Sequence, residues 1–240
     1  MLSVCCYVDR PSAKIRQQPL KALCASEDSP NYQVILAAAK NLGGDLSDWQ
    51  RGWCTEEVVS MFLRGRRGDV TAAAQILAQA LFWREQYKDV LTGSRVPKWQ
   101  GDLRVLAQGT MGHPLLYLCC RQQTHSFSVP DTLDHVACVL ETAVRKMPPG
   151  VQQVDAVVDC HGFCLWYNMD PRIVIGIAEM LRQPYRDRLR TVMMVDAPLG
   201  LQPVWKVIYP LLPAATKKKV QFLSAESATS AVQELFTVFK

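Results

Sequence analysis

The 240-residue chain lacks the short motifs that mark several large classes of enzyme. It has no glycine-rich phosphate loop, no dinucleotide-binding fingerprint, no nucleophile elbow and no His-Glu-x-x-His sequence. Cys160-His161 followed by Cys164 is the one arrangement that suggests a metal or a thiol nucleophile, and no second pair of ligands lies at zinc spacing. We therefore interpret Cys160 as a small buried residue at the end of a strand.

Long apolar runs are also missing. The longest run without a charge covers residues 105–120 and includes His113 and Pro114, whereas a membrane-spanning helix needs about 20 apolar residues. The first residues, MLSVCCYVDR, carry no basic segment ahead of an apolar one, so we do not expect a secreted protein. Nine cysteines without a regular spacing favour a cytosolic protein with reduced thiols.

Charge is present but weakly biased. The 27 basic and 22 acidic residues give a net charge of +5, which is too small to indicate nucleic-acid binding by itself. The basic residues form three clusters, whose importance depends on whether folding brings them together. These clusters are Arg64, Arg66 and Arg67; Arg182, Arg186, Arg188 and Arg190; and Lys217, Lys218 and Lys219.

Sequence patterns divide the chain into three parts. Residues 1–30 show no helical or strand period and predict a mobile tail. Residues 31–92 predict a helical region, in which Thr55 and Asp69 each cap a helix with apolar residues at helical spacing. Residues 93–240 predict a second domain, whose first part, 93–111, contains Pro97 and two glycines and is expected to be irregular.

Strands and helices alternate after residue 111. Apolar runs predict strands at 115–120, 154–158, 191–195 and 220–223. Helices are expected to begin near Pro130, at Pro171 after the cap Asp170, at Pro203, and over 225–239. This order predicts an α/β fold with a mostly parallel sheet covered by helices, preceded by an all-helical N-terminal cap.

Three stretches, in this order, resemble CRAL-TRIO lipid-binding proteins. Residues 62–70 read F-L-R-G-R-R-G-D-V, with Trp83-Arg84 downstream, where the family typically has F-L-R-A-R-K-F-D-V and W-R. Residues 158–162 contain the D-x-x-G that ends a strand of the lipid-binding domain. Residues 185–223 contain D-R-L, V-D-A-P and Y-P-L-L in register with the family pattern. The resemblance covers residues 55–223.

The branch that these residues resemble most is that of phosphatidylinositol-transfer proteins of the yeast secretory type. The resemblance implies one phospholipid inside the domain, with its acyl chains in an apolar pocket under a gate helix. Burial is worth about 0.8 kcal/mol per CH₂ group, so two acyl chains supply a large hydrophobic driving force.

The resemblance also implies head-group residues. The positions that match those serving the inositol phosphate are Arg66, Arg67 and Lys219, and Asp187 stands where the family has a glutamate. Arginine is suited to this role because its planar fork of donors matches phosphate oxygens. We expect Arg66, Arg67 and Lys219 to converge on one anion site.

Phosphatidylcholine is disfavoured by the same comparison. Family members that hold this lipid use hydroxyl side chains at two positions where this chain has Val154 and Ala156. Neither side chain can form a hydrogen bond with a phosphate, so phosphatidylinositol, or a less polar lipid, is the expected ligand.

A gate helix is expected over residues 203–212. Its apolar residues occupy nearly the whole circumference, which is typical either of a buried core helix or of a gate that meets the bilayer when open. The expected gate residues are Gly200 as a hinge, with Val204, Trp205, Ile208, Leu211 and Leu212. Arg182, Arg186, Arg188 and Arg190 would attract anionic lipids if they lay on the same face.

The sequence therefore predicts a cytosolic, peripherally membrane-associated protein that binds one phospholipid, with phosphatidylinositol favoured, and presents or transfers it. No catalysis, metal, cofactor or nucleic acid is expected. Three alternatives stay open at this point. They are a carrier of a sterol, tocopherol or retinoid, a regulatory protein-interaction module with a vestigial pocket, and a thiol-dependent enzyme that uses Cys160.

Overall fold

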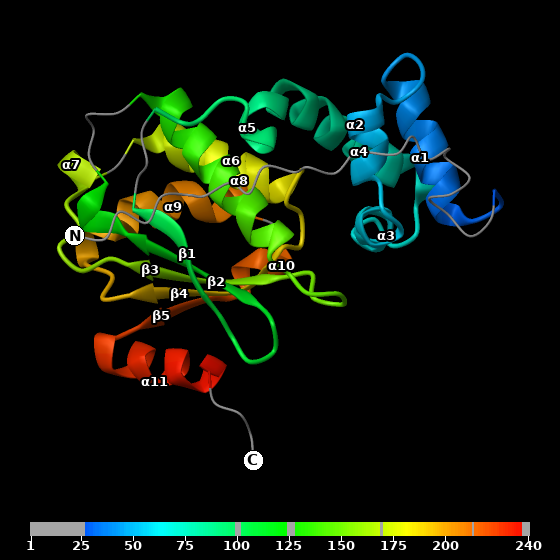
Figure 1. Cartoon of the computed structure of the whole chain (residues 1–240). Coiled ribbons are helices and arrows are strands. Elements are labelled where there is room, and N and C mark those ends of the chain that lie inside the picture. Colours follow the sequence, from blue (N-terminus) through cyan, green and yellow to red (C-terminus); the bar gives the residue numbers. More distant parts are fainter. Residues whose placement is uncertain (1–26, 99–101, 124–127, 169, 213, 237–240) are drawn as a thin grey trace. The chain divides into compact units, whose positions relative to one another are not determined.

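The computed structural model describes residues 27–98, 102–123, 128–168, 170–212 and 214–236 (Figure 1). Within these ranges, the side chains of Val204, Val207, Ile208, Leu211, Ala215 and Phe236 are not described. Most of the predicted tail, residues 1–26, lies outside the described residues. The chain divides into two compact units, residues 1–95 and 96–240, each of which is described by itself.

The first unit is helical. It consists of α1 (Pro30–Asn41), α2 (Asp48–Trp53), α3 (Glu56–Arg64), α4 (Val70–Gln86) and α5 (Lys88–Thr92). Apolar side chains from α1, α3 and α4, among them Ile35, Phe62 and Leu77, form its buried core. The predicted caps are confirmed, because Thr55 accepts a hydrogen bond from the backbone N–H of Val58 and Asp69 from that of Ala72.

A tight turn joins α3 to α4 and carries two of the predicted head-group residues. The backbone N–H of Gly68 donates to Leu63 O, and that of Arg67 donates to Arg64 O, which closes the end of α3. Gly68 has a φ of 86° and Arg67 a φ of 56°, so both adopt the left-handed conformation that such helix ends require. Arg66 and Arg67 are exposed in this turn.

The second unit is built on a five-stranded sheet with the order β1-β2-β3-β4-β5. The strands are β1 (Leu103–Gln108), β2 (Pro114–Cys119), β3 (Val154–Asp159), β4 (Leu189–Val195) and β5 (Val220–Leu223). Strands β2 to β5 are parallel, and β1 pairs with β2 in the antiparallel direction. The α/β fold class with a mostly parallel sheet is thus confirmed, as are four of its strands.

The expectation that residues 93–111 are irregular is wrong over β1. This strand alternates half-buried and exposed residues at the sheet edge, and its register shifts between Val105 and Ala107. Leu106, at the shift, is 54% exposed. An edge strand of mixed polarity has a weak local signal, because its conformation depends on pairing with β2.

Helices cover both faces of the sheet (Figure 1). On one face lie α6 (Val129–Arg145), α8 (Pro171–Arg182) and α9 (Gln202–Leu211). On the other, α11 (Ala225–Phe236) packs against a cluster that includes Leu115, Val157 and Met193. The remaining short elements are η2 (Cys120–Gln122), α7 (Leu165–Asn168), η3 (Leu199–Leu201) and α10 (Ala214–Lys217).

The D-x-x-G stretch forms the turn after β3. Asp159 ends the strand, and its carboxylate accepts hydrogen bonds from the backbone N–H of His161 at 3.0 Å and from the Tyr117 hydroxyl at 2.8 Å. Gly162 has a φ of 69°, a conformation that glycine adopts without strain. The motif therefore has a structural role in directing the chain out of the sheet.

Among the described residues, no helix combines the length and apolarity needed to span a bilayer.

Candidate functional site

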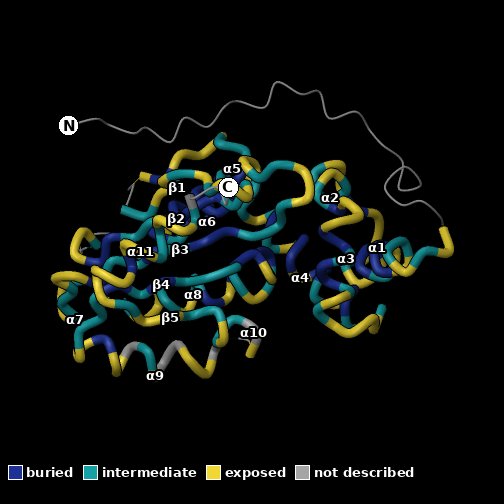
Figure 2. The backbone as a smooth tube through the Cα atoms, turned by 90° about the horizontal axis from the view of Figure 1, so that it is seen from below, coloured by how far each residue is buried: buried dark blue, intermediate teal, exposed yellow. Residues whose placement is uncertain are grey.

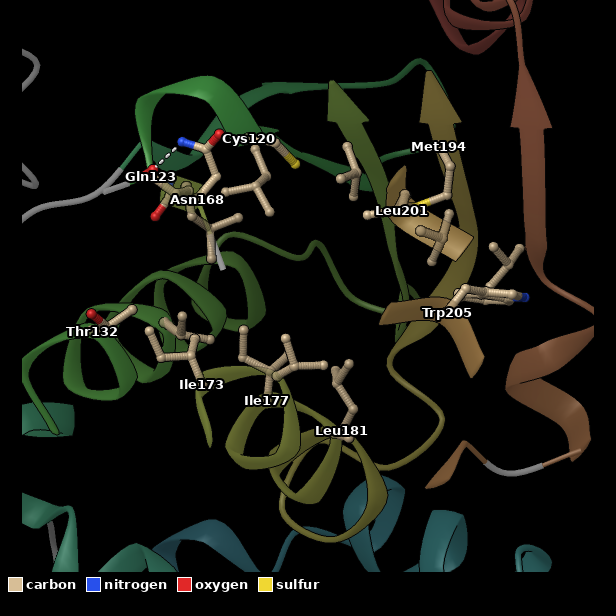
Figure 3. Close-up of a pocket in the computed structure, with 18 of the residues that line it drawn as sticks. Cys120, Gln123, Thr132, Asn168, Ile173, Ile177, Leu181, Met194, Leu201 and Trp205 are labelled. Atoms are coloured by element: carbon tan, nitrogen blue, oxygen red, sulfur yellow. Dashed lines mark hydrogen bonds between the residues drawn. The ribbon is translucent and has the colours of Figure 1, made fainter. Parts of the chain in front are cut away.

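A cavity of about 290 Å³ lies within the second unit, between the sheet and the helices α6, α8 and α9 (Figure 3). Side chains that alternate along the parallel strands point into it, because every second residue of a strand faces the same side. They are Leu118 of β2, Val158 of β3, Val192 and Met194 of β4, and Val220 of β5. The floor of the cavity is therefore apolar.

The helices supply the opposite wall. Ile173, Ile177 and Leu181 recur every four residues along α8, so the same helical face meets the cavity along its length (Figure 3). Trp205 of α9 and Leu212 just after it close the side formed by the predicted gate. The ring of Trp205 lies edge-on against the Phe222 ring of β5, with centroids 5.3 Å apart.

Polar side chains gather at one end of the cavity, beyond the carboxyl ends of the strands. They include Gln123, Thr132, Asn168 and Asp170. Asn168 is used internally, since its Oδ1 accepts from the Cys164 N–H at 2.7 Å and its Nδ2 donates to Gln123 O. Asp170 caps α8 and pairs with Arg172. No sequence motif indicated this group, because its members come from separate loops and helix ends.

The predicted head-group residues do not line the cavity. Asp187 lies shortly before β4, and Lys219 lies directly before β5. Both are therefore at the amino-terminal edge of the parallel strands, opposite the polar end of the cavity. Lys219 is half-buried, and its Nζ donates to Leu189 O at 2.5 Å. Asp187 is exposed, and its backbone oxygen accepts from Gln153 Nε2. Thr216, which is close to Lys219 in the sequence, lines this end of the cavity.

Arg66 and Arg67 belong to the first unit, whereas Lys219 belongs to the second. Their convergence on one anion site therefore stays a prediction. Val154 and Ala156 occupy alternate positions of β3 with the cavity-lining Val158, so they belong to the same face of the sheet. That face carries no hydroxyl group at either position.

Helix α9 covers the cavity, and most of its described side chains are exposed. Among its described side chains, Trp205 is half-buried and Gln202, Pro203, Lys206, Tyr209 and Pro210 are exposed. In Figure 2, α9 is drawn largely in yellow, teal and grey, whereas much of β2 is dark blue. Gly200 lies in η3, and Leu212 is buried at the far end. The side chains of Val204, Ile208 and Leu211 lie outside the described part, so their predicted gate roles stay predictions.

The expected arginine face beside the gate is only partly present. Arg188 is buried and donates to Gln152 O at 3.0 Å. Arg190 forms a bidentate ion pair with the buried carboxylate of Asp155. Both guanidinium groups thus donate to buried acceptors beside the sheet, since a buried carboxylate or carbonyl oxygen needs a hydrogen-bond donor. The condition that all four arginines share one lipid-facing surface is therefore not met by Arg188 and Arg190.

Cys160 lies directly after β3 and is fully buried, as the sequence predicts. A hydrogen bond from the Cys120 thiol lowers the pKa of Cys160, and the same contact raises the pKa of Cys120. Within the described ranges, no group of three or more His, Cys, Asp or Glu side chains is arranged to hold a metal ion.

An exposed apolar patch was not indicated by the sequence. Trp166 and Tyr167 of α7 are 80% and 71% exposed, and Leu199 of η3 is 82% exposed. These segments follow β3 and β4, so they lie at the carboxyl-terminal edge of the sheet. The Trp166-Tyr167 pair in the short segment after β3 is the signal that could have suggested it.

Comparisons with known proteins agree with this geometry. Residues 103–237 match the CRAL/TRIO domain. The chain is 26% identical over 250 residues to the phosphatidylinositol transfer protein PDR17 of Saccharomyces cerevisiae, covering 88% of this chain and 70% of that protein. It is 24% identical over 236 residues to the CRAL-TRIO domain-containing protein C23B6.04c of Schizosaccharomyces pombe, covering 88% of this chain and 22% of that longer protein.

A solved structure supports the fold. The crystal structure of Sfh5 superposes with a TM-score of 0.60 at 14% identity, covering 88% of this chain and 81% of that chain. At this identity the likeness concerns the fold alone. The match of residues 103–237, more than half of the chain, shows that the chain belongs to the CRAL/TRIO domain family of lipid-binding proteins.

Proposed function

We propose that this protein binds one phospholipid, phosphatidylinositol, in the cavity of its second unit and transfers or presents it at membranes. The observation that carries the proposal is the apolar cavity between the sheet and α8, which helix α9 covers. The similarity to a protein named as a phosphatidylinositol transfer protein supports the choice of lipid. Binding and release of a lipid require no covalent chemistry, cofactor or metal.

The size of the cavity supports a moving gate. At about 290 Å³ it lies at the lower end of ligand cavities, which span roughly 300–1,000 Å³, and a diacyl phospholipid is a large ligand. A lipid of this kind requires the cavity to expand. Helix α9 is the element suited to move, because Pro210 removes one of its backbone hydrogen bonds and its described side chains are little buried.

The head group is assigned to Arg66, Arg67, Asp187 and Lys219. Lys219 supports this assignment best, because its ammonium group already meets a carbonyl oxygen at the amino-terminal edge of the sheet and can exchange that partner for a phosphate. Asp187 adjoins the same edge and can accept hydrogen bonds from inositol hydroxyls. Val154 and Ala156 offer no such bonds to phosphatidylcholine.

The membrane-facing side is assigned to the carboxyl-terminal edge of the sheet. Trp166, Tyr167 and Leu199 expose large apolar areas there, and tryptophan and tyrosine favour the membrane–water interface. Phe163 and Asn168, which flank the two aromatic residues, line the cavity, so the patch borders the ligand site. The protein would act peripherally on a membrane from this edge.

Lys219→Ala tests the head-group assignment. We expect the variant to bind phosphatidylinositol about tenfold more weakly, since a charge-assisted hydrogen bond is worth about 1.5–3 kcal/mol. The matched control is Lys218→Ala, which removes an exposed ammonium group from the neighbouring position. The measurement is phosphatidylinositol transfer between vesicles as a function of lipid content. Equal loss in both variants would remove Lys219 from the site.

A further inference from the structure

The side-chain amide of Gln123 is the group at the polar end of the cavity that the fold leaves without a partner. Its Nε2 is enclosed and meets no hydrogen-bond acceptor among the described residues. Gln123 itself lines the cavity, next to the end of β2 (Figure 3). Buried amide nitrogens nearly always have an acceptor in folded proteins, so an unpaired one that lines a ligand cavity points to a ligand atom.

The neighbouring polar groups differ from Gln123 because their bonds serve the protein. Both ends of the Asn168 amide are engaged, with Cys164 N and with the backbone oxygens of Arg121 and Gln123. Asn168 thereby holds the backbone of Gln123 in place at the wall. Thr132 gives its proton to Ser128 O at 3.1 Å, and its oxygen can accept a further hydrogen bond.

We infer that Gln123 is a specificity-determining residue, whose amide binds a hydroxyl oxygen on an otherwise apolar ligand at the carboxyl-terminal end of the cavity. A hydroxyl group fits this end because it accepts a hydrogen bond from Gln123 Nε2 and can donate its own proton to an acceptor such as Thr132 Oγ1. Figure 3 places Gln123 and Thr132 at the end away from Trp205, with Ile173, Ile177 and Leu181 along the wall between.

This site is separate from the head-group assignment. Lys219 adjoins the amino-terminal ends of the strands, whereas Gln123 follows the carboxyl-terminal end of β2. The inference rests on the proposed use of the cavity as a ligand site, but it does not depend on phosphatidylinositol. It adds a residue, Gln123, that selects for a hydroxyl group on the part of a ligand that reaches this end of the cavity.

The test uses the full chain and a matched pair of probes, 1-tetradecanol and tetradecane. Each displaces the fluorescent probe N-phenyl-1-naphthylamine from the cavity, and the ratio of the two displacement concentrations measures recognition of the hydroxyl. From the parent protein to Gln123→Leu, we expect the preference for the alcohol to fall about tenfold, the size of one hydrogen bond. Gln122→Leu, at the exposed neighbouring glutamine outside the cavity lining, is the matched control and should retain the preference.

An unchanged ratio in Gln123→Leu would overturn the inference. Gln123→Met, which keeps the length of the side chain without a donor, replaces the leucine variant if thermal denaturation shows that the latter is unfolded. Phosphatidylinositol transfer is measured on the same proteins. If Gln123→Leu loses the hydroxyl preference but the parent protein transfers no phosphatidylinositol, the role of Gln123 is supported and the proposed lipid is wrong. If the parent protein transfers phosphatidylinositol but the ratio is unchanged in Gln123→Leu, the proposed lipid is supported and the role of Gln123 is wrong.

Discussion

Asp159 shows how one side chain can account for a family motif. Its carboxylate accepts one hydrogen bond from the turn that follows β3 and another from Tyr117 on the neighbouring strand β2. The aspartate of D-x-x-G therefore ties two parallel strands together near their carboxyl-terminal ends, on the face of the sheet that α11 covers. Its position in the sequence was recognisable, but its partner Tyr117 depends on the pairing of β2 with β3.

Tyr117→Phe should destabilise the protein by about 1.5–3 kcal/mol, because the carboxylate of Asp159 loses a charge-assisted hydrogen bond. Thermal denaturation measures this loss. Tyr167→Phe, at an exposed tyrosine, is the control and should leave the melting temperature unchanged. Equal melting temperatures for all three proteins would contradict the structural role of the bond.

The same contact predicts a dependence on alkaline pH. Burial and the hydrogen bond to Asp159 raise the pKa of the Tyr117 phenol above its usual value of about 10. A group whose pKa is raised on folding contributes stability that is complete below the unfolded pKa and is lost as pH rises through the folded one. The parent protein should thus lose part of its stability above about pH 10, and Tyr117→Phe should lose less.

Helix caps could be predicted from the sequence, whereas contacts between residues far apart in the sequence could not. Thr55, Asp69 and Asp170 were predicted as helix caps, because the cap and the residues that it caps are adjacent in sequence. Gln123 gave no signal, since its burial depends on the cavity. The placement of Arg188 and Arg190 could not be predicted, because a cluster in sequence does not reveal which internal carboxylates or carbonyls its members meet.

Among the elements, α9 is the one to which we assign the proposed entry of a lipid. A core helix and a gate have the same apolar sequence, and the two differ in how deeply their side chains are buried. The described side chains of α9 are half-buried or exposed, and those of Val204, Val207, Ile208 and Leu211 lie outside the described part, so a variant is needed to separate the two. The buried strands, by contrast, were predictable because each is a short apolar run between turns.

Trp205→Asp separates the two interpretations of α9. For a gate, we expect lipid transfer and vesicle binding to fall strongly while the protein stays folded, because Trp205 is only half-buried. Leu201→Asp, at a buried neighbouring position, is the contrasting variant and should unfold the protein, since an unpaired buried carboxylate costs several kcal/mol. Unfolding of Trp205→Asp in thermal denaturation would identify α9 as a core helix.

The short helix α7 should determine membrane contact. Trp166→Ser removes a side chain that is 80% exposed, so we expect severalfold weaker binding to vesicles at an unchanged melting temperature. Met111→Ser is the control, because Met111 is 66% exposed in the turn that joins β1 to β2 and lies away from the carboxyl-terminal edge. Vesicle co-sedimentation compares the two, and equal losses would argue against the patch.

At the scale of the whole molecule, the alternation of strands and helices was enough to predict the parallel sheet, and the order of three family-like stretches was enough to predict the family. The edge strand β1 was missed, because its formation depends on β2 rather than on its own pattern. The cavity could be expected, whereas its polar end could not, because Gln123, Thr132 and Asn168 are separated in sequence and meet only after folding.

The central claim is that the protein carries a single phosphatidylinositol molecule in this cavity. Mass spectrometry of the intact protein under native conditions, after incubation with vesicles containing equal amounts of phosphatidylinositol and phosphatidylcholine, tests it most directly. We predict one bound lipid per chain, with phosphatidylinositol in clear excess and its share reduced in Lys219→Ala. Protein without bound lipid, or with phosphatidylcholine bound equally well, would contradict the account.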